Sequence, residues 1–132
     1  MQNLHAHSVF CDGKNTPEEM IRACLAAGMD SAGISIHSPL PFANGWAAKA
    51  RNVAPFLAEM RRLQAKYADK MAVYAGVEWD VLSDAKWLEP FDYAIGSVHF
   101  LPVGDDPTAY PTVDDSPETT RRFLAEAFGG DS

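Results

Sequence analysis

Short apolar runs alternate with longer amphipathic ones along this chain, and that alternation restricts the fold more than any other feature. The short runs predict strands at residues 3–5, 31–36, 71–77 and 93–98. The last three are nearly continuous in apolar and small residues, as in a sheet that is covered on both faces. A strand–helix order of this kind predicts an α/β fold with a parallel sheet covered by helices.

The predicted helices have recognisable starts and stops. Thr16 and Glu19 form a capping-box pattern around Pro17, which suits the first helical position, and Gly28 suits the end of that helix. A second helix is predicted over residues 48–67, with a kink or a new start at Pro55. A short helix capped by Ser83 and a last one from residue 116 to Gly129-Gly130 complete the set.

Polar side chains of one chemical kind occur where the predicted strands end. All four histidines and one acid lie at these points, and Asp12 lies in the loop after the first strand; the set is His5, His7, Asp12, His37, Glu78 and His99. The carboxyl ends of parallel strands meet at one edge of a sheet, where α/β proteins build their sites. His5 and His7 are two residues apart, so in an extended segment both imidazoles point the same way. Imidazole and carboxylate together predict a divalent metal site.

Each of these residues also has an ordinary structural interpretation when it is taken alone. A His-x-His pair occurs by chance, and a single histidine after a strand is often a surface or hydrogen-bonded side chain. Asp12 precedes Gly13, and this pair is typical of tight turns. The coincidence of all four histidines at strand ends favours the metal site. Cys11 and Cys24 are not arranged as a zinc–thiolate motif and are expected to be free thiols.

Charge and hydropathy limit the partners. The 18 acidic and 11 basic residues give a net charge of −7, which argues against non-specific binding to nucleic acid. A small anionic substrate is still possible where metal ions reverse the local charge. No apolar run approaches the ~18 residues of a membrane span, and the N-terminus does not resemble a secretion signal. We therefore expect a cytoplasmic protein without membrane contact.

Four segments resemble the polymerase and histidinol phosphatase (PHP) family, and within it the histidinol-phosphatases. They are HAHSVFCDGK, ISIHSPLPF, YAGVEWD and FDYAIGSVHFL, in this order along the chain. The resemblance implies that the chain is the N-terminal part, about four βα units, of a distorted (β/α)7 TIM-like barrel with parallel strands. It also implies a histidine-biosynthesis enzyme that hydrolyses histidinol phosphate to L-histidinol and phosphate.

The same resemblance implies two or three divalent ions of zinc, iron or manganese. His5 and His7 would hold the first ion, with Glu78 as a bridge to a second ion that His99 also holds. Asp12 and His37 would hold the third. The catalytic set would be His5, His7, Glu78 and His99, acting through a hydroxide held between the ions.

The resemblance also has gaps. A further metal-ligand histidine, a late Asp-x-His motif and the phosphate-holding basic residues of the family have no counterpart, and a barrel of this type needs ~250 residues. We expect residues 1–132 to be an incomplete PHP domain that is impaired or inactive alone and self-associates through its open sheet edge. Two alternatives stay open. One is another PHP phosphoesterase, acting on a different phosphomonoester or on nucleotide ends, and the other is a non-catalytic, partial metal-binding domain.

Overall fold

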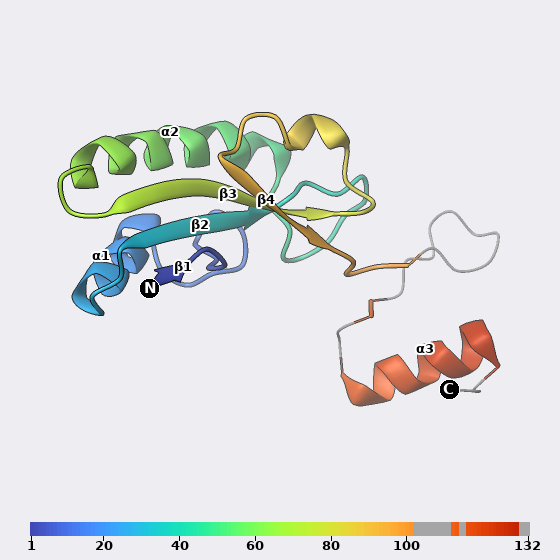
Figure 1. The fold of residues 1–132 in the computed structure, drawn as a ribbon. Helices are drawn as coiled ribbons and strands as arrows, with labels where there is room; N and C mark the ends of the chain where they lie inside the picture. Colours follow the sequence, from blue (N-terminus) through green and yellow to red (C-terminus); the bar gives the residue numbers. More distant parts are fainter. Residues whose placement is uncertain (102–111, 114–115, 130–132) are drawn as a thin grey trace. The chain divides into compact units, whose positions relative to one another are not determined.

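The computed structural model describes residues 1–101, 112–113 and 116–129, in two compact units that divide after Gly96 (Figure 1). The first unit holds nearly all of the sheet and the second holds the last helix. The elements are β1 (Gln2–Asn3), α1 (Pro17–Ala26), β2 (Ser31–His37), α2 (Ala50–Tyr67), β3 (Ala72–Asp80), the 3-10 helix η1 (Ala85–Trp87), β4 (Tyr93–Ser97) and α3 (Pro117–Phe128). Among the described residues, no helix combines the length and apolar character that crossing a membrane requires.

The sheet has the strand order β1-β2-β3-β4, and β2 pairs in parallel with both β1 and β3. This confirms the predicted α/β class with parallel strands. The register of β2 on β3 begins at Ser31 opposite Ala72 and ends at His37 opposite Glu78. Both strands are longer than predicted, so His37 and Glu78 lie inside their strands and not after them. The pairing sets these two side chains next to each other, because residues in register share one face of the sheet.

One face of β2 and β3 forms the hydrophobic core. Alternate residues of the two strands are buried with the apolar stripes of the helices, and Figure 1 shows α2 running alongside β3 and α1 beside β2. The strand residues in this core are Ala32, Ile34, Ile36, Val73, Ala75 and Val77, and the helix residues include Ile21, Cys24, Phe56, Met60 and Leu63. Each large side chain contributes about 1.5–3 kcal/mol by leaving water.

Two predicted helix features are confirmed. The Thr16–Glu19 capping box is present, and Gly28 has a φ of 72° beyond the end of α1. Of the two alternatives at Pro55, a kink or a new start, the new start is excluded, because α2 continues through Pro55 as one helix. A proline inside a helix costs about 3 kcal/mol, but the buried side chains of α2 contribute more than that together. The short helix is capped by Asp84 and not by Ser83, whose hydroxyl instead donates to the Pro39 carbonyl oxygen at 2.8 Å.

Tyr93 of β4 lies against two glycines of the neighbouring strands. A Cβ atom on Gly33 would lie 2.4 Å from the Tyr93 hydroxyl oxygen, and one on Gly76 would lie 2.1 Å from the ring carbon Cζ. Only glycine therefore leaves room for this ring. The hydroxyl donates to the Leu4 carbonyl oxygen at 2.5 Å. Burial raises the pKa of Tyr93, which keeps the hydroxyl protonated and able to donate.

The second unit contains the end of β4 and α3. The His99 carbonyl oxygen accepts from the Val113 N–H at 2.9 Å, and Phe100 pairs with Thr112 in an isolated antiparallel bridge. Helix α3 begins at Pro117 as predicted, with Ser116 as its cap, and ends at Gly129 with a φ of 73°. Residues 102–111 lie outside the described residues, as does Gly130 at the predicted end of this helix.

Candidate metal centre

One carboxylate oxygen is the meeting point of three imidazoles. Oε2 of Glu78 lies 2.9 Å from Nε2 of His5, 3.0 Å from Nε2 of His7 and 3.3 Å from Nδ1 of His37. The Glu78 side chain is 7% exposed, whereas that of His5 is 51% exposed. The cluster therefore has a buried carboxylate at its base and a side that is open to solvent.

The backbone of the first unit explains how these side chains meet. His37 and Glu78 are opposite each other in the β2–β3 register. The segment after β1 continues beside β2, because the Ser35 N–H donates to the Ala6 carbonyl oxygen at 2.9 Å. Ala6 is buried, so the residues before and after it, His5 and His7, both point toward the cluster, as their two-residue spacing predicts.

Asp12 joins a second group with His7 and His37. Its Oδ1 lies 3.5 Å from Nε2 of His37, and one ligand atom from each of the three residues lies within 4.8 Å of the others. The loop that carries Asp12 turns tightly, since the Ser8 carbonyl oxygen accepts from the N–H groups of both Cys11 and Gly13 at 3.0 Å. Gly13 is required there, because a Cβ atom would lie 2.4 Å from the His7 backbone.

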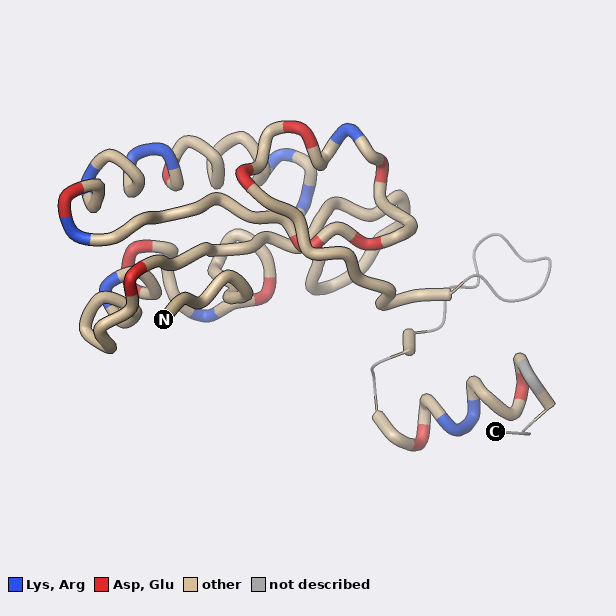
Figure 2. Tube along the Cα trace, in the orientation of Figure 1, with Lys and Arg blue, Asp and Glu red and all other residues tan. Residues whose placement is uncertain are grey.

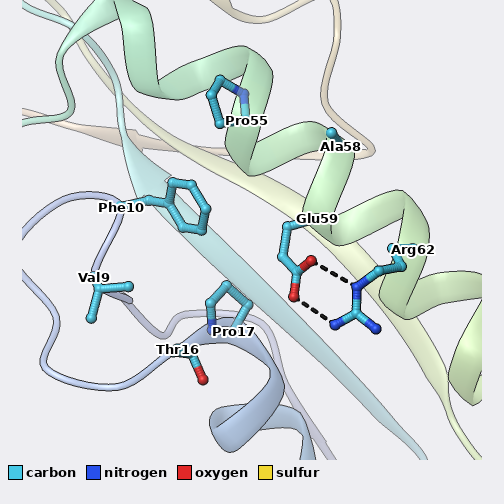
Figure 3. A pocket seen from close by; sticks show the side chains of 8 residues that line it. All are labelled: Val9, Phe10, Thr16, Pro17, Pro55, Ala58, Glu59 and Arg62. Atoms are coloured by element: carbon cyan, nitrogen blue, oxygen red, sulfur yellow. Dashed lines mark hydrogen bonds and ion pairs between the residues drawn. The ribbon is translucent and has the colours of Figure 1, made fainter.

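The loop is also fixed from outside by α2. Asn52 Nδ2 donates to the Phe10 carbonyl oxygen at 3.1 Å, and the Phe10 ring meets that of Phe56 edge to face at 5.5 Å. Beside this contact is a groove of about 560 Å³ that Phe10, Pro17 and Pro55 line together with the Glu59–Arg62 ion pair (Figure 3). None of the predicted metal ligands lines this groove.

Two rings fix the orientation of the His37 imidazole. It stacks on the His7 ring at 4.1 Å between centroids and 7° between planes, and it meets Trp46 edge to face at 4.6 Å. Asn44 holds Trp46 in place, since its Oδ1 accepts from the Trp46 N–H at 3.2 Å. The structure thus places Trp46 against a predicted ligand.

The donor atoms of this cluster fit divalent metal ions. Imidazole and carboxylate ligands bind zinc at about 2.0–2.2 Å, which separates neighbouring ligand atoms by roughly 3–3.5 Å. The separations of Glu78 Oε2 from the three histidine nitrogens, 2.9, 3.0 and 3.3 Å, are close to that range. Because Glu78 is buried, an unpaired negative charge there would be costly, and a bound cation would offset it.

Cys11 lies in the cluster although its sequence pattern gave it no role. Its Sγ is 3.7 Å from Nδ1 of His7, on the opposite side of that ring from Glu78. Burial raises the pKa of the Cys11 thiol, so the group carries its proton at neutral pH. Its position next to Asp12 in the sequence was the only available signal.

His99 belongs to the second unit and follows β4 as predicted. Its Nδ1 lies 3.2 Å from the Ser97 hydroxyl oxygen, and its backbone carbonyl accepts from Val113. The assignment of His99 as a metal ligand remains a prediction.

Three basic side chains of α2 are paired with acids. Arg61 pairs with Asp92 at 2.7 Å, and Arg62 pairs with Glu18 at 2.7 Å. Lys66 also pairs with Glu18. Figure 2 shows lysine and arginine positions at several points along α2.

Comparison with known proteins agrees with the fold. Residues 3–130 match the PHP domain family. The chain is 31% identical over 107 residues to a Deinococcus radiodurans protein named "Probable histidinol-phosphatase", and 32% identical over 104 residues to the DNA polymerase/3'-5' exonuclease PolX of Bacillus subtilis. Each alignment covers 74% of this chain, but only 41% and 18% of those relatives.

Two solved structures are similar to this one. A Listeria monocytogenes protein assigned as the histidinol phosphatase HisK superposes with a TM-score of 0.83 at 20% identity, over 98% of this chain and 55% of that one. The histidinol phosphate phosphatase of Lactococcus lactis, complexed with zinc, L-histidinol and phosphate, gives 0.65 at 25% identity, over 96% and 51%. The chain thus spans about half the length of both solved proteins. From its sequence match over residues 3–130 and the fold it shares with these structures, the chain belongs to the PHP family.

Proposed function

We propose that this protein is a metal-dependent phosphomonoesterase that converts histidinol phosphate to L-histidinol and phosphate in histidine biosynthesis. The observation that carries the proposal is the convergence of three imidazoles on Glu78 Oε2. The Deinococcus relative and the zinc, L-histidinol and phosphate complex of the Lactococcus enzyme support the choice of substrate.

Two or three ions of zinc, iron or manganese would be held by the side chains of the cluster. His5 and His7 would hold one ion, with Glu78 bridging to a second that His99 also holds. Asp12 and His37 would hold the third. Bound ions would supply a nucleophile at neutral pH by lowering the pKa of water, and would offset the negative charge of the phosphoryl group.

The residues themselves define the direction from which substrate approaches. Glu78 and His37 are buried, whereas the side chains of His5 and Asp12 are 51% and 41% exposed. A phosphoryl group would therefore enter between the two exposed ligands. His7 lies between them and contacts both halves of the cluster, because it belongs to both ligand groups.

The second candidate is a phosphoesterase that acts on nucleotide ends, which the PolX relative favours. The net charge of −7 and the ion-paired basic face of α2 favour the small substrate instead. We also propose a cytoplasmic location and self-association through the open sheet edge. We expect the 132 residues alone to bind metal but to be impaired or inactive in catalysis, because both similar solved proteins are about twice as long.

The test measures zinc content and phosphate release by the purified protein. Substrates are histidinol phosphate, p-nitrophenyl phosphate and a 3′-phosphorylated oligonucleotide. Glu78→Gln is expected to lose most bound zinc and any activity, while Glu89→Gln, at an exposed glutamate, keeps both. Wild-type protein that binds no divalent metal would contradict the proposal. Faster phosphate release from the oligonucleotide than from histidinol phosphate would favour nucleotide ends as the substrate.

A further inference from the structure

One side chain of the candidate metal centre contacts a predicted ligand without being a predicted ligand itself. Glu78 contacts His7 at 3.0 Å, and His7 contacts Cys11 at 3.7 Å. His7 therefore lies between the buried carboxylate and the Cys11 sulfur.

We propose that Cys11 is a positioning residue, which holds the His7 imidazole in the orientation that binds metal. This inference rests on the proposed function, because it concerns the same site. It differs from the metal assignment in giving a role to a side chain that holds no ion itself.

The two nitrogens of His7 explain the role. Nε2 faces Glu78 and Nδ1 faces the Cys11 sulfur. A histidine that binds metal through one nitrogen usually donates the N–H of the other to a fixed partner, which sets its tautomer and ring orientation. In this role the Cys11 sulfur, 3.7 Å away, would accept the proton on Nδ1. A single side chain would thus set the tautomer and ring orientation of His7, the ligand that the two groups share.

The surroundings of Cys11 keep it in place independently of metal. The Cys11 N–H donates to the Ser8 carbonyl oxygen at 3.0 Å, and so does the N–H of Gly13. The loop is also held by Asn52 of α2, which donates to the Phe10 carbonyl oxygen. The thiol is therefore a fixed point against which His7 is oriented.

The experiment measures the zinc dissociation constant of the metal-free protein by competition with a chromophoric chelator. Cys11→Ala and Cys11→Val remove the polar atom, and we expect each to weaken zinc binding about 10–100-fold. Cys11→Ser should recover part of the loss, because a hydroxyl keeps one donor and one acceptor. Cys24→Ala, which removes the other thiol from the core, should leave the zinc affinity unchanged while lowering stability.

An NMR measurement separates positioning from a general loss of structure. In zinc-loaded wild-type protein the Nδ1 proton of His7 should be visible and slow to exchange, and in Cys11→Ala it should exchange faster. Zinc affinity of both Cys11→Ala and Cys11→Val within twofold of wild type would overturn the inference while leaving the metal site intact. If either variant fails to fold, the other decides. Wild-type protein without zinc affinity would instead overturn the proposed function, and this inference with it.

Discussion

The two faces of the β2–β3 pair differ in every respect that matters for function. The helix-covered face carries Ile34, Ile36 and Val77, all fully buried in one apolar cluster. On the opposite face, the same strands carry Gly33 and Gly76 under the Tyr93 ring, followed by His37 and Glu78. Adjacent residues of one strand therefore serve opposite purposes, and the pleat alone separates them.

This difference teaches which substitutions the chain can absorb. The helix-covered face is held by many nonspecific apolar contacts, so its side chains determine the stability. The other face makes a few polar and ring contacts that each need a particular distance. Its side chains therefore determine whether a metal ion can bind. We therefore expect substitutions on the first face to change the free energy of unfolding most, and those on the second to change metal affinity most.

The largest effect is expected at the centre of the apolar cluster. Phe56→Ala should lower the free energy of unfolding by about 3–5 kcal/mol, because it leaves a cavity where a fully buried ring was. Urea denaturation measures the change. Val81→Ala, at a side chain that is half exposed, should change it by less than about 0.5 kcal/mol. A loss below about 1 kcal/mol for Phe56→Ala would mean that the two faces do not differ as described.

The next largest effect is expected from zinc binding on the other face, and it leaves the apolar core unchanged. Zinc at about 100 times its dissociation constant should stabilise the native protein by about 2.7 kcal/mol, because it binds the folded state. Thermal denaturation with zinc and with excess chelator measures the difference. His37→Gln should remove most of this stabilisation, whereas Phe56→Ala should retain it. Equal zinc stabilisation of His37→Gln and wild type would remove His37 from the site.

A smaller effect is expected on the second face, where the Tyr93 ring packs against Gly76. Gly76→Ala should cost about 1–3 kcal/mol, because its Cβ atom would lie 2.1 Å from Tyr93 Cζ. Gly45→Ala, which has nothing within 4 Å of the added atom, is the matched control. In a double-mutant cycle, Tyr93→Leu should make Gly76→Ala much less costly. Additive costs would show that the ring and the glycine are independent.

The smallest effect is expected at the ion pairs outside the core. The Lys66 and Arg62 side chains hold the pKa of Glu18 at about 2, below its ordinary value of 4.5. A depressed pKa stabilises the folded state above pH 4.5, and that contribution is lost as the pH falls from 4.5 through 2. Glu18→Gln should therefore lose less stability than wild type over this interval in acid denaturation, whereas Glu89→Gln should follow wild type. Equal losses of stability in Glu18→Gln and wild type over this pH interval would show that the ion pairs of Glu18 do not stabilise the fold.

Most of the fold could be predicted because local signals and burial agree. The Thr16–Glu19 box, the glycine after α1 and the apolar strands each depend on neighbouring residues in the sequence, and the structure confirms them. The continuity of α2 through Pro55 could not be predicted, because it depends on how the helix packs against the sheet.

The sequence predicted which side chains come together in the candidate site, but it did not predict the contacts that hold them there. Parallel pairing places strand ends together, so His37 and Glu78 were expected to meet. The approach of Cys11 to His7 depends on the loop turning back on the Ser8 carbonyl oxygen, and the Tyr93 ring finds its space only where two separate strands both have glycine. Such contacts depend on distances between distant segments, and a single sequence has no local signal for them.

The hydrogen bond from Tyr93 to the Leu4 carbonyl oxygen joins positions 89 residues apart, next to His5. β1 has only two residues, so its own pairing with β2 is short. During synthesis the N-terminal segments leave the ribosome first, yet the segment that carries His5 and His7 is completed only when β4 emerges. We therefore expect the newly made protein to take up metal late, only after Tyr93 of β4 has been translated.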